Sequence, residues 1–236
     1  MRRLLIEQAN EIIKLEGEDH KHFATVLRAN VGDEIETTCG DGFVYIYQAF
    51  EITKTYTKLK KVNYREDNSE AKHNVTLFMP VLKSDKNELV VQKAVELGVK
   101  KIIPFISTFS QAKNIRKERL IKIAREAVMQ CGRSFVPEIT DVVDFNELIC
   151  KMNDYNLIVF PYEKATGNDL HTFLLQAKYL DSVGIIIGSE GGFSDKEAET
   201  LNNITTPVTL GKRILRAETA CIAVLSAVMY ELGEWK

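Results

Sequence analysis

The sequence predicts an α/β protein in which a small β-rich domain precedes a larger domain built on a parallel sheet. Up to about residue 70 the chain is rich in Tyr, Thr, Ile and Val, which favour strands, in short runs separated by turns. Beyond that point, continuous apolar runs alternate with stretches of helical periodicity. Apolar strands that alternate with helices are typical of a parallel sheet covered on both faces.

The β-rich region contains a hairpin motif and ends in a polar segment. Asp41 and Gly42 form a favoured turn, and after it the aromatic residues Phe43, Tyr45 and Tyr47 alternate with other side chains. Residues 63–74 are polar and carry charges of both signs, which is typical of a linker or long loop. We therefore place the domain boundary there and predict domains at residues 1–72 and 73–236.

The second region contains the alternating strands and helices. Strands are expected at residues 75–80, 101–106, 156–161, 183–188 and 207–210. Helices are expected at residues 84–97, capped by Ser84, and at residues 117–131, 194–201 and 217–232. Gly98 and Gly132 follow two of these helices as terminating glycines, and Ser194 and Glu197 form a capping box. The last helix is apolar on more than one face, which indicates burial in a large core or against another subunit.

The composition excludes several classes of protein. Over 236 residues, 31 Lys and Arg oppose 33 Asp and Glu, and the net charge of −2 excludes a protein that coats nucleic acid by bulk charge. The four cysteines form no CxxC pair, which argues against a zinc site or a disulfide scaffold. The N-terminal stretch lacks the apolar core of a signal peptide, and no apolar run approaches the roughly 20 residues of a membrane helix. We therefore expect a cytoplasmic protein without a metal site.

Local basic segments remain compatible with RNA binding. Residues 113–133 carry seven Lys or Arg against two Glu, and lysines recur between positions 54 and 61. A groove for RNA on a chain of small net charge would concentrate positive charge in this way. Two solvated faces are the alternative, and a steep fall of RNA affinity with salt would distinguish the groove from them.

The segment 185–194, IIIGSEGGFS, is the first candidate site. A buried strand ends at Gly188, a glycine-rich turn follows, and a capped helix begins at Ser194. Glycines at such a junction let a ligand approach the backbone, and the helix N-terminus offers unpaired N–H groups to an anion. A tight turn without a ligand explains the same pattern. The segment matches neither the dinucleotide-binding fingerprint nor the nucleophile motif of α/β-hydrolases.

The segment 210–220, LGKRILRAETA, is a second strand-to-helix junction. Lys212, Arg213 and Arg216 lie within five positions beside Gly211. Three cations at a glycine turn suit a phosphate or a developing negative charge. The alternative is a solvated basic turn in which Arg216 pairs with Glu218. Because both junctions lie in one half of the chain, we expect them to form a single composite pocket.

These two segments resemble those of the RsmE family, SPOUT-class methyltransferases that methylate N3 of a uridine in 16S ribosomal RNA. Further matching stretches are QKAVELGV at residues 92–99, AVMQCGRSFVPEI at 127–139 and VLRANVGDEI at 26–35, so the resemblance covers nearly the whole chain. The chain differs from the family at Ser189, where proline is frequent, and after Arg3, where two leucines stand in place of aromatic residues.

The resemblance implies a fold, a cofactor and partners. The C-terminal domain would be a SPOUT parallel sheet threaded into a trefoil knot, and the N-terminal domain a PUA-like β-barrel that helps to hold RNA. The methyl donor would be S-adenosylmethionine, and the substrate 16S rRNA of the small ribosomal subunit. The protein would be a homodimer packed through the knotted domains.

The resemblance also implies the site residues. Three loops would grip the donor through Phe160, Pro161, Tyr162, Glu163, Ile187, Gly188, Ser189, Glu190, Gly191, Gly192, Leu210, Gly211, Arg213, Ile214, Leu215 and Thr219. Uracil N3 must lose a proton, so Arg216 and then Arg213 are expected to stabilise the charge on the uracil oxygens, and Glu218 or Glu190 to accept the proton. The residues expected at the RNA are Arg3, Arg28, Lys113, Arg116 and Arg133.

Two other readings of the same scaffold remain. One is an RNA-binding ribosome assembly factor without catalysis, against which the intact glycine loops count. The other is a SPOUT enzyme that modifies tRNA or a ribose 2′-hydroxyl, against which the whole-chain match to one rRNA family counts.

Overall fold

The computed structural model describes residues 3–83, 85–177 and 180–235. The chain forms two compact units, Met1–Glu70 with Val128–Val136, and Ala71–Ala127 with Pro137–Lys236. The division after Glu70 lies two residues from the boundary expected after residue 72. No pattern in the sequence predicted that residues 128–136 belong to the first unit.

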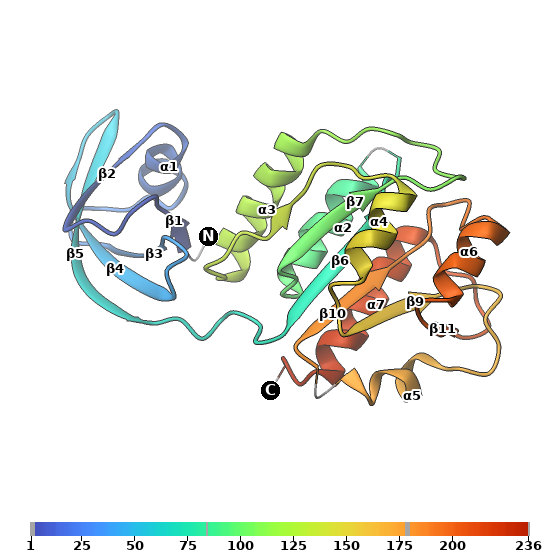
Figure 1. Cartoon of the computed structure of the whole chain (residues 1–236). Helices are drawn as coiled ribbons and strands as arrows, with labels where there is room; N and C mark the ends of the chain where they lie inside the picture. Colours follow the sequence, from blue (N-terminus) through green and yellow to red (C-terminus); the bar gives the residue numbers. More distant parts are fainter. Residues whose placement is uncertain (1–2, 84, 178–179, 236) are drawn as a thin grey trace. The chain divides into compact units, whose positions relative to one another are not determined.

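The first unit is built on a mixed sheet with the strand order β1-β3-β4-β5-β2. Only β1 and β3 are parallel, and the sheet curls around a core that includes Leu4, Phe23, Tyr47 and Leu59 (Figure 1). Its elements are β1 Arg3–Leu5, β2 Ile12–Glu16, α1 Gly17–Lys21, the π-helical turn η1 His22–Val26, β3 Glu34–Thr38, β4 Phe43–Ile52 and β5 Tyr56–Glu66. The hairpin expected at Asp41 and Gly42 joins β3 to β4 and is confirmed.

The expected linker at residues 63–74 is too long and is corrected by the structure. Strand β5 continues to Glu66 and pairs with the start of β4, and β6 already begins at Asn74. The side chains at the end of β5 are exposed, so they are polar although their backbone belongs to the sheet. The polar residues 63–66 thus form the solvent-exposed end of a strand, and only residues 67–73 connect β5 to β6.

The second unit contains a fully parallel sheet with the strand order β11-β9-β10-β6-β7-β8. This confirms the expected parallel sheet. The strands are β6 Asn74–Pro80, β7 Lys101–Phe105, β8 Glu138–Ile139, β9 Leu157–Pro161, β10 Ser182–Ile186 and β11 Pro207–Val208. Strands β10 and β11 end two residues earlier than expected, because the chain turns there into loops.

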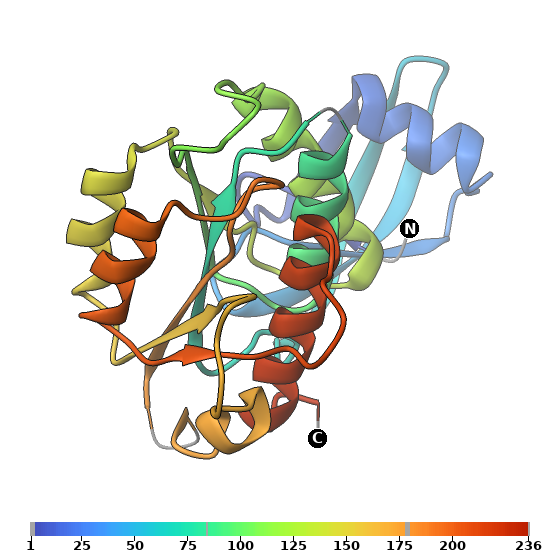
Figure 2. The ribbon, with the colours of Figure 1, turned by 90° about the vertical axis from the view of Figure 1, so that its right-hand side faces the viewer.

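Helices cover both faces of this sheet, with α4 and α6 on one side and α2 and α7 on the other (Figure 2). The helices are α2 Lys86–Glu96, α3 Lys117–Cys131, α4 Phe145–Met152, α5 Leu170–Leu174, α6 Asp195–Asn202 and α7 Ala217–Glu231. The expected cap Ser84 lies outside the described residues, and Asp85 occupies the N-cap of α2. The short helices α4 and α5, which the sequence interpretation missed, begin at the capping residues Asp144 and Asp169.

Aromatic packing fixes the layer between the sheet and helices α4 and α6. Phe193, which follows the first glycine loop, lies with its ring centroid 6.2 Å from that of Phe105 and 5.6 Å from that of Phe160. Phe193 therefore anchors the C-terminal end of the loop after β10 in the core. Close packing also explains Gly184 in β10, where a Cβ atom would lie 2.6 Å from Ile158 Cδ1 and 2.8 Å from Phe78 Cε2. Among the described residues, no helix combines the length and the hydropathy needed to cross a membrane.

Candidate active site

A cavity of about 560 Å³ opens at the carboxyl ends of β9, β10 and β11. These strands are neighbours in one parallel sheet, so the loops that follow them meet at one edge. The volume lies within the range of small-molecule sites. The cavity is lined by Lys86, Pro161, Tyr162, Glu163, Ile187, Gly188, Ser189, Glu190, Gly191, Gly192, Phe193, Thr209, Leu210, Gly211, Lys212, Arg213, Ile214, Leu215, Arg216, Ala217 and Ala220. The expected composite pocket is thus present within the second unit.

The glycines of the loop after β10 make room for the protein's own chain. The Gly192 amide donates to the Ser189 carbonyl at 2.9 Å, which closes a tight turn, and Gly192 has φ +71°. A Cβ atom on Gly191 would lie 2.7 Å from Phe109 Cβ and 3.1 Å from Phe109 O. On Gly192 it would lie 3.2 Å from Glu163 Oε1. The close neighbours at Gly191 and Gly192 are thus Phe109 and Glu163, and the approach of a ligand to the same loop stays a prediction.

The capping box expected at the start of α6 is confirmed, and its glutamate also bonds to the loop after β7. The Ser194 amide donates to Glu197 Oε2 at 2.9 Å, and the Glu197 amide donates to Ser194 Oγ at 3.3 Å. The other carboxylate oxygen of Glu197 accepts from the Thr108 amide at 2.8 Å. Glu197 is 6% exposed, so this buried carboxylate ties the loop after β7 to the loop that forms the cavity wall.

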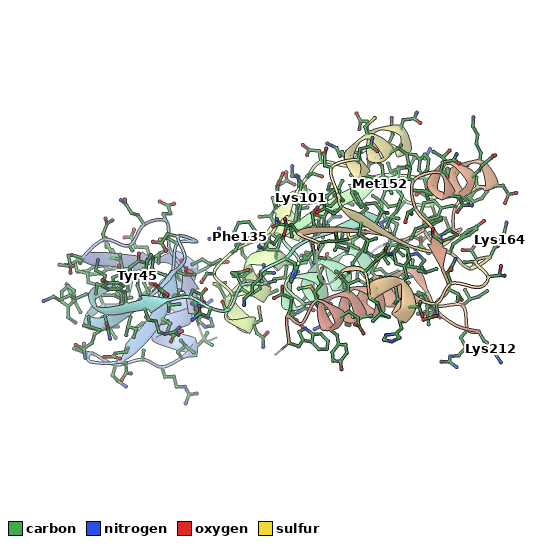
Figure 3. All side chains as sticks on the ribbon, turned by 60° about the horizontal axis from the view of Figure 1, so that its bottom comes forward. Tyr45, Lys101, Phe135, Met152, Lys164 and Lys212 are labelled. Atoms are coloured by element: carbon green, nitrogen blue, oxygen red, sulfur yellow. The ribbon has the colours of Figure 1, made fainter. Side chains whose placement is uncertain are left out.

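The loop after β11 presents three cations that have no partner among the described residues. Lys212, Arg213 and Arg216 are exposed, and none forms a hydrogen bond or ion pair within the described part of the chain. The Lys212 side chain extends outward from the ribbon (Figure 3). Arg216 occupies the N-cap of α7 with extended backbone angles, and its side chain lines the cavity. An Arg216–Glu218 pair, the alternative drawn from the sequence, is not formed, because Glu218 pairs elsewhere.

The partner of Glu218 is Lys86, a residue that the sequence interpretation missed. Lys86 Nζ lies 3.3 Å from Glu218 Oε2 and 3.6 Å from Glu190 Oε1. Glu190 Oε1 also accepts from the Lys83 amide at 3.3 Å. Lys86 lies in the first turn of α2, shortly after the carboxyl end of β6, so its position at the binding edge of the sheet was the available clue.

Two of the residues expected at the donor do not line the cavity. Phe160 is fully buried beneath it, with its ring stacked on Tyr162 at 5.4 Å, because alternation along β9 turns its side chain into the core. Thr219 is exposed on α7, outside the lining. The other expected donor-binding residues all line the cavity, as do Arg213 and Arg216, whereas Glu218, also expected in catalysis, is not among the lining residues. Besides Lys86, the additional lining residues are Phe193, Thr209, Lys212, Ala217 and Ala220.

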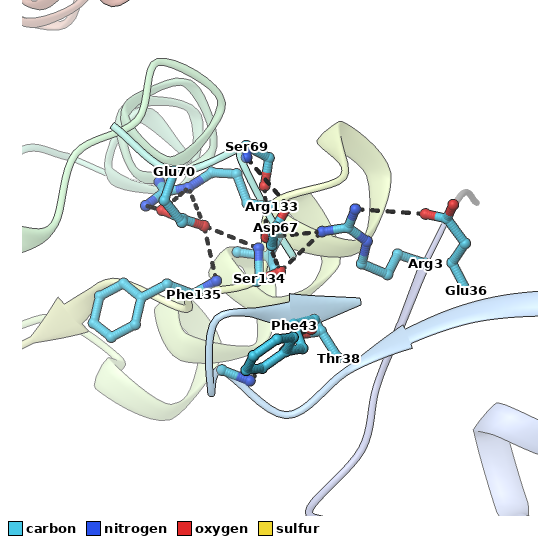
Figure 4. A network of polar contacts seen from close by, with 12 residues as sticks. Arg3, Glu36, Thr38, Phe43, Asp67, Ser69, Glu70, Arg133, Ser134 and Phe135 are labelled. Atoms are coloured by element: carbon cyan, nitrogen blue, oxygen red, sulfur yellow. Dashed lines mark hydrogen bonds and ion pairs between the residues drawn. The ribbon is translucent and has the colours of Figure 1, made fainter. Parts of the chain in front are cut away.

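Two of the residues expected at RNA are instead buried in a polar network of the first unit (Figure 4). Arg3 donates to Ser134 Oγ at 2.9 Å and to Asp67 Oδ2 at 3.3 Å, and Arg133 Nη2 donates to Glu70 Oε2 at 2.7 Å. Both guanidinium groups bond to carboxylates and are shielded from water, which leaves little of either exposed to a phosphate, and Arg3 Nε has no hydrogen-bond partner among the described residues. Sequence alone showed the cations but not these distant partners.

The buried Asp67 carboxylate is the centre of this network. Burial opposes its ionisation, yet hydrogen bonds from Ser134 and Ser69, together with the Arg3 charge, lower the pKa of Asp67 below its usual value. A carboxylate that accepts several hydrogen bonds remains ionised in this way. The network therefore joins β1, the connection after β5 and the segment 128–136 within the first unit.

The remaining three residues expected at RNA are exposed. Arg28, Lys113 and Arg116 form no ion pair within the described part of the chain, and Arg28 has φ +55°, the only such non-glycine residue described. Much of the surrounding positive charge is already paired, as in Lys117 with Asp141 and Arg119 with Glu88. The basic segment at residues 113–133 therefore contains fewer unpaired cations than its composition suggests.

The fold, with its cavity at the carboxyl ends of parallel strands, is that of a class of RNA methyltransferases. The RNA methyltransferase domain family matches residues 69–229. The chain is 32% identical to ribosomal RNA small subunit methyltransferase E of Bacillus subtilis, over 98% of this chain and 97% of that protein. The chain belongs to this methyltransferase E family, which confirms the resemblance seen in the sequence.

Solved structures agree over the whole length of the chain. Ribosomal RNA small subunit methyltransferase E from Neisseria gonorrhoeae, bound to S-adenosyl methionine, superimposes with a TM-score of 0.82 at 25% identity, covering 98% of this chain and 97% of that one. A putative methyltransferase from Legionella pneumophila, in complex with the cofactor SAM, gives a TM-score of 0.87 at 26% identity and 97% coverage of both chains. These likenesses confirm the expected fold class.

Proposed function

We propose that this protein is an S-adenosylmethionine-dependent methyltransferase that modifies N3 of a specific uridine in 16S rRNA of the small ribosomal subunit. The observation that carries the proposal is the cavity beneath the loops after β9, β10 and β11, with Arg213 and Arg216 unpaired at its rim. The names of the full-length relatives and the donor held by two similar structures support the same activity.

The residues of the cavity suit the methyl donor. Backbone groups of residues 187–192 and 210–215 are available to an adenine edge, and Pro161, Tyr162 and Leu215 supply apolar walls. S-adenosylmethionine carries a positively charged sulfonium and an ammonium group, for which Glu163 and Glu190 are complementary. Glu190 Oε2 is buried and has no hydrogen-bond partner among the residues that the structure describes, which indicates unmet acceptor capacity at this site.

The chemistry assigned to the protein is charge stabilisation and proton removal. When bound, S-adenosylmethionine supplies an electrophilic methyl group. Uracil N3 carries a proton at neutral pH, and its loss spreads negative charge onto the carbonyl oxygens. Arg216, supported by Arg213, would stabilise that charge more strongly in the transition state than in the ground state. Glu218 or Glu190 would accept the proton.

Arg28, Lys113 and Arg116 are proposed to contact RNA, since they are exposed and unpaired among the described residues.

The outward face of α7, with Ala223, Ala227 and Tyr230 exposed or half-buried, is proposed to pack against a second copy. Light scattering should then give twice the chain mass of 26.8 kDa, and a monomer would contradict the proposed homodimer.

Transfer of labelled methyl groups tests the function directly. The protein is incubated with labelled S-adenosylmethionine and, in parallel, small ribosomal subunits that lack the modification, free 16S rRNA and tRNA. The modified nucleoside is then identified by mass spectrometry. The proposal expects N3-methyluridine in the ribosomal RNA samples.

The other outcomes identify the alternatives. Label in tRNA alone, or on a ribose, would replace the proposed substrate. RNA binding without transfer would favour an assembly factor and would contradict the proposed activity.

A further inference from the structure

Lys86 joins three segments that are far apart in the sequence. Its ammonium group, from the first turn of α2, lies against Glu190 in the loop after β10 and Glu218 in the first turn of α7. We propose that Lys86 is a positioning residue, which holds these two carboxylates in place and so fixes two walls of the cavity. This inference deepens the proposed function and rests on it for its catalytic consequence.

The three side chains are largely withdrawn from water. The exposed fractions are 30% for Lys86, 19% for Glu190 and 12% for Glu218. Glu190 Oε2 is buried without a hydrogen-bond partner among the described residues, and the buried Glu218 Oε2 has only the Lys86 ammonium group near it, at 3.3 Å, within the same part of the chain. Charges that are shielded in this way interact more strongly than solvated pairs, because the effective dielectric constant is lower.

The charge balance makes Lys86 necessary. Two carboxylates share one ammonium group, and no other ion pair reaches either of them within the described part of the chain. Without the ammonium group, Glu190 and Glu218 would repel each other across a partly buried space. Glu190 Oε1 also accepts a hydrogen bond from the Lys83 amide at 3.3 Å, and this neutral donor leaves Lys86 as the one cation paired with Glu190 in the described part of the chain.

The consequence is geometric. Glu190 lies in the tight turn from Ser189 to Gly192 within the loop after β10, and Glu218 lies two residues after Arg216. Separation of the two carboxylates would displace that loop and the start of α7, and with it Arg216. Small displacements of reacting groups reduce turnover strongly. Lys86 thus acts on the reaction through the groups that it holds.

Three variants isolate this role. Lys86→Met removes the ammonium group and keeps an unbranched apolar side chain, whereas Lys86→Arg keeps the charge. Lys83→Met is the matched control, since Lys83 is exposed and contacts Glu190 only through its backbone amide. Amide hydrogen exchange of residues 187–194 and 217–220 is measured for each, together with kcat and KM for methyl transfer and the affinity for S-adenosylhomocysteine.

The proposal expects faster exchange in both segments of Lys86→Met, and wild-type exchange in Lys86→Arg and Lys83→Met. Neutralising one carboxylate in the double variant Lys86→Met/Glu218→Gln should slow exchange again, because the repulsion is removed. For methyl transfer, kcat of Lys86→Met should fall about 10- to 100-fold while the KM for the donor changes little. Lys86→Arg should restore most of kcat.

Exchange in Lys86→Met that matches Lys83→Met would overturn the inference. Faster exchange with unchanged kcat would also overturn the positioning role, leaving a purely structural ion pair. The exchange measurement needs no methyl transfer. An inactive wild-type protein would therefore contradict the proposed function, while the exchange data would still decide whether Lys86 holds the two segments.

Discussion

Arg216 is the residue on which the proposed chemistry most depends. It stands at the N-cap of α7, lines the cavity and has no partner among the described side chains. A cation held at the edge of a cavity without a competing carboxylate remains available to a negative charge that develops in the reaction. The sequence marked this arginine, but it also allowed a pairing with Glu218 that the structure replaces by the pair with Lys86.

Substitution of this arginine tests its role. Arg216→Ala should lower kcat by about 10²- to 10³-fold, as loss of a transition-state donor does elsewhere. The affinity for S-adenosylhomocysteine, measured by calorimetry, should change by less than about threefold, since the Arg216 side chain is proposed to contact the uracil and not the methyl donor. Lys196→Ala, on the exposed surface of α6, serves as control. Unchanged turnover of Arg216→Ala would remove the residue from the mechanism.

Gly191 is a second residue whose chemistry follows directly from the structure. An added Cβ atom would meet both Cβ and the carbonyl oxygen of Phe109, so the backbone itself must shift. Gly191→Ala should lower the free energy of unfolding of the second unit by about 1–3 kcal/mol, as overpacking does. Fluorescence of the single tryptophan, Trp235, reports this transition during denaturant titration. A variant as stable as the wild type would show that Phe109 can move freely.

At the scale of elements, residues 128–136 stand out because they pack in the first unit although residues 71–127, which precede them, belong to the second. The C-terminal end of α3 supplies Met129 to the core of that unit, and Arg133 and Ser134 to its polar network. Ser134, Arg3 and Asp67 are thus held together by contacts between positions more than 60 residues apart. The strength of this junction depends on the ionised form of Asp67.

The pH dependence of this junction has a definite sign. Because folding lowers the pKa of Asp67 from its ordinary value of 3.8, its contribution to stability is present above that pH and is lost as the pH falls through the folded-state value. Asp67→Asn should destabilise the first unit at pH 7 by about 3 kcal/mol, the cost of breaking a buried pair. Amide exchange of residues 3–5 measures the effect. The difference between variant and wild type should narrow below pH 3.8, and a constant difference would contradict it.

Local patterns predicted most of these elements well. The capping box of α6, the bounds of α3 and the apolar parallel strands all depend on neighbouring residues, so the sequence contains enough information to place them. The end of β5 was misplaced because exposed strand residues and linker residues have the same polar composition. The helix α4 is only eight residues long, too short for periodicity to identify it.

At the scale of the whole molecule, the glycine loops and their strands predicted the composite cavity, but ion pairing between distant segments escaped prediction. Lys86, Arg3 and Arg133 are all basic residues whose roles are set by carboxylates far along the chain. A charge seen in sequence has no visible partner, so a buried structural arginine and an RNA-binding arginine look alike. The fold was therefore more predictable than the electrostatics of its sites.

RNA affinity distinguishes these two kinds of arginine. Arg116→Ala should weaken RNA binding and reduce the dependence of log affinity on log salt concentration by about one, because one phosphate contact is lost. Arg3→Ala should instead increase amide exchange in β1 and leave the salt dependence unchanged while the unit remains folded. Binding to a 16S rRNA fragment across a salt series measures both. A reduced slope for Arg3→Ala would reverse the assignment.

The excursion of residues 128–136 also bears on how such a protein can be divided or recombined. A single cut after residue 70 would detach the first unit from Met129 and from the partners of Glu70, because these lie beyond a long stretch of the other unit. A functional exchange of this unit between homologues therefore requires two matched crossovers. Its coding sequence is discontinuous, and replacement of the leading segment alone would yield a chimera with a mismatched interior.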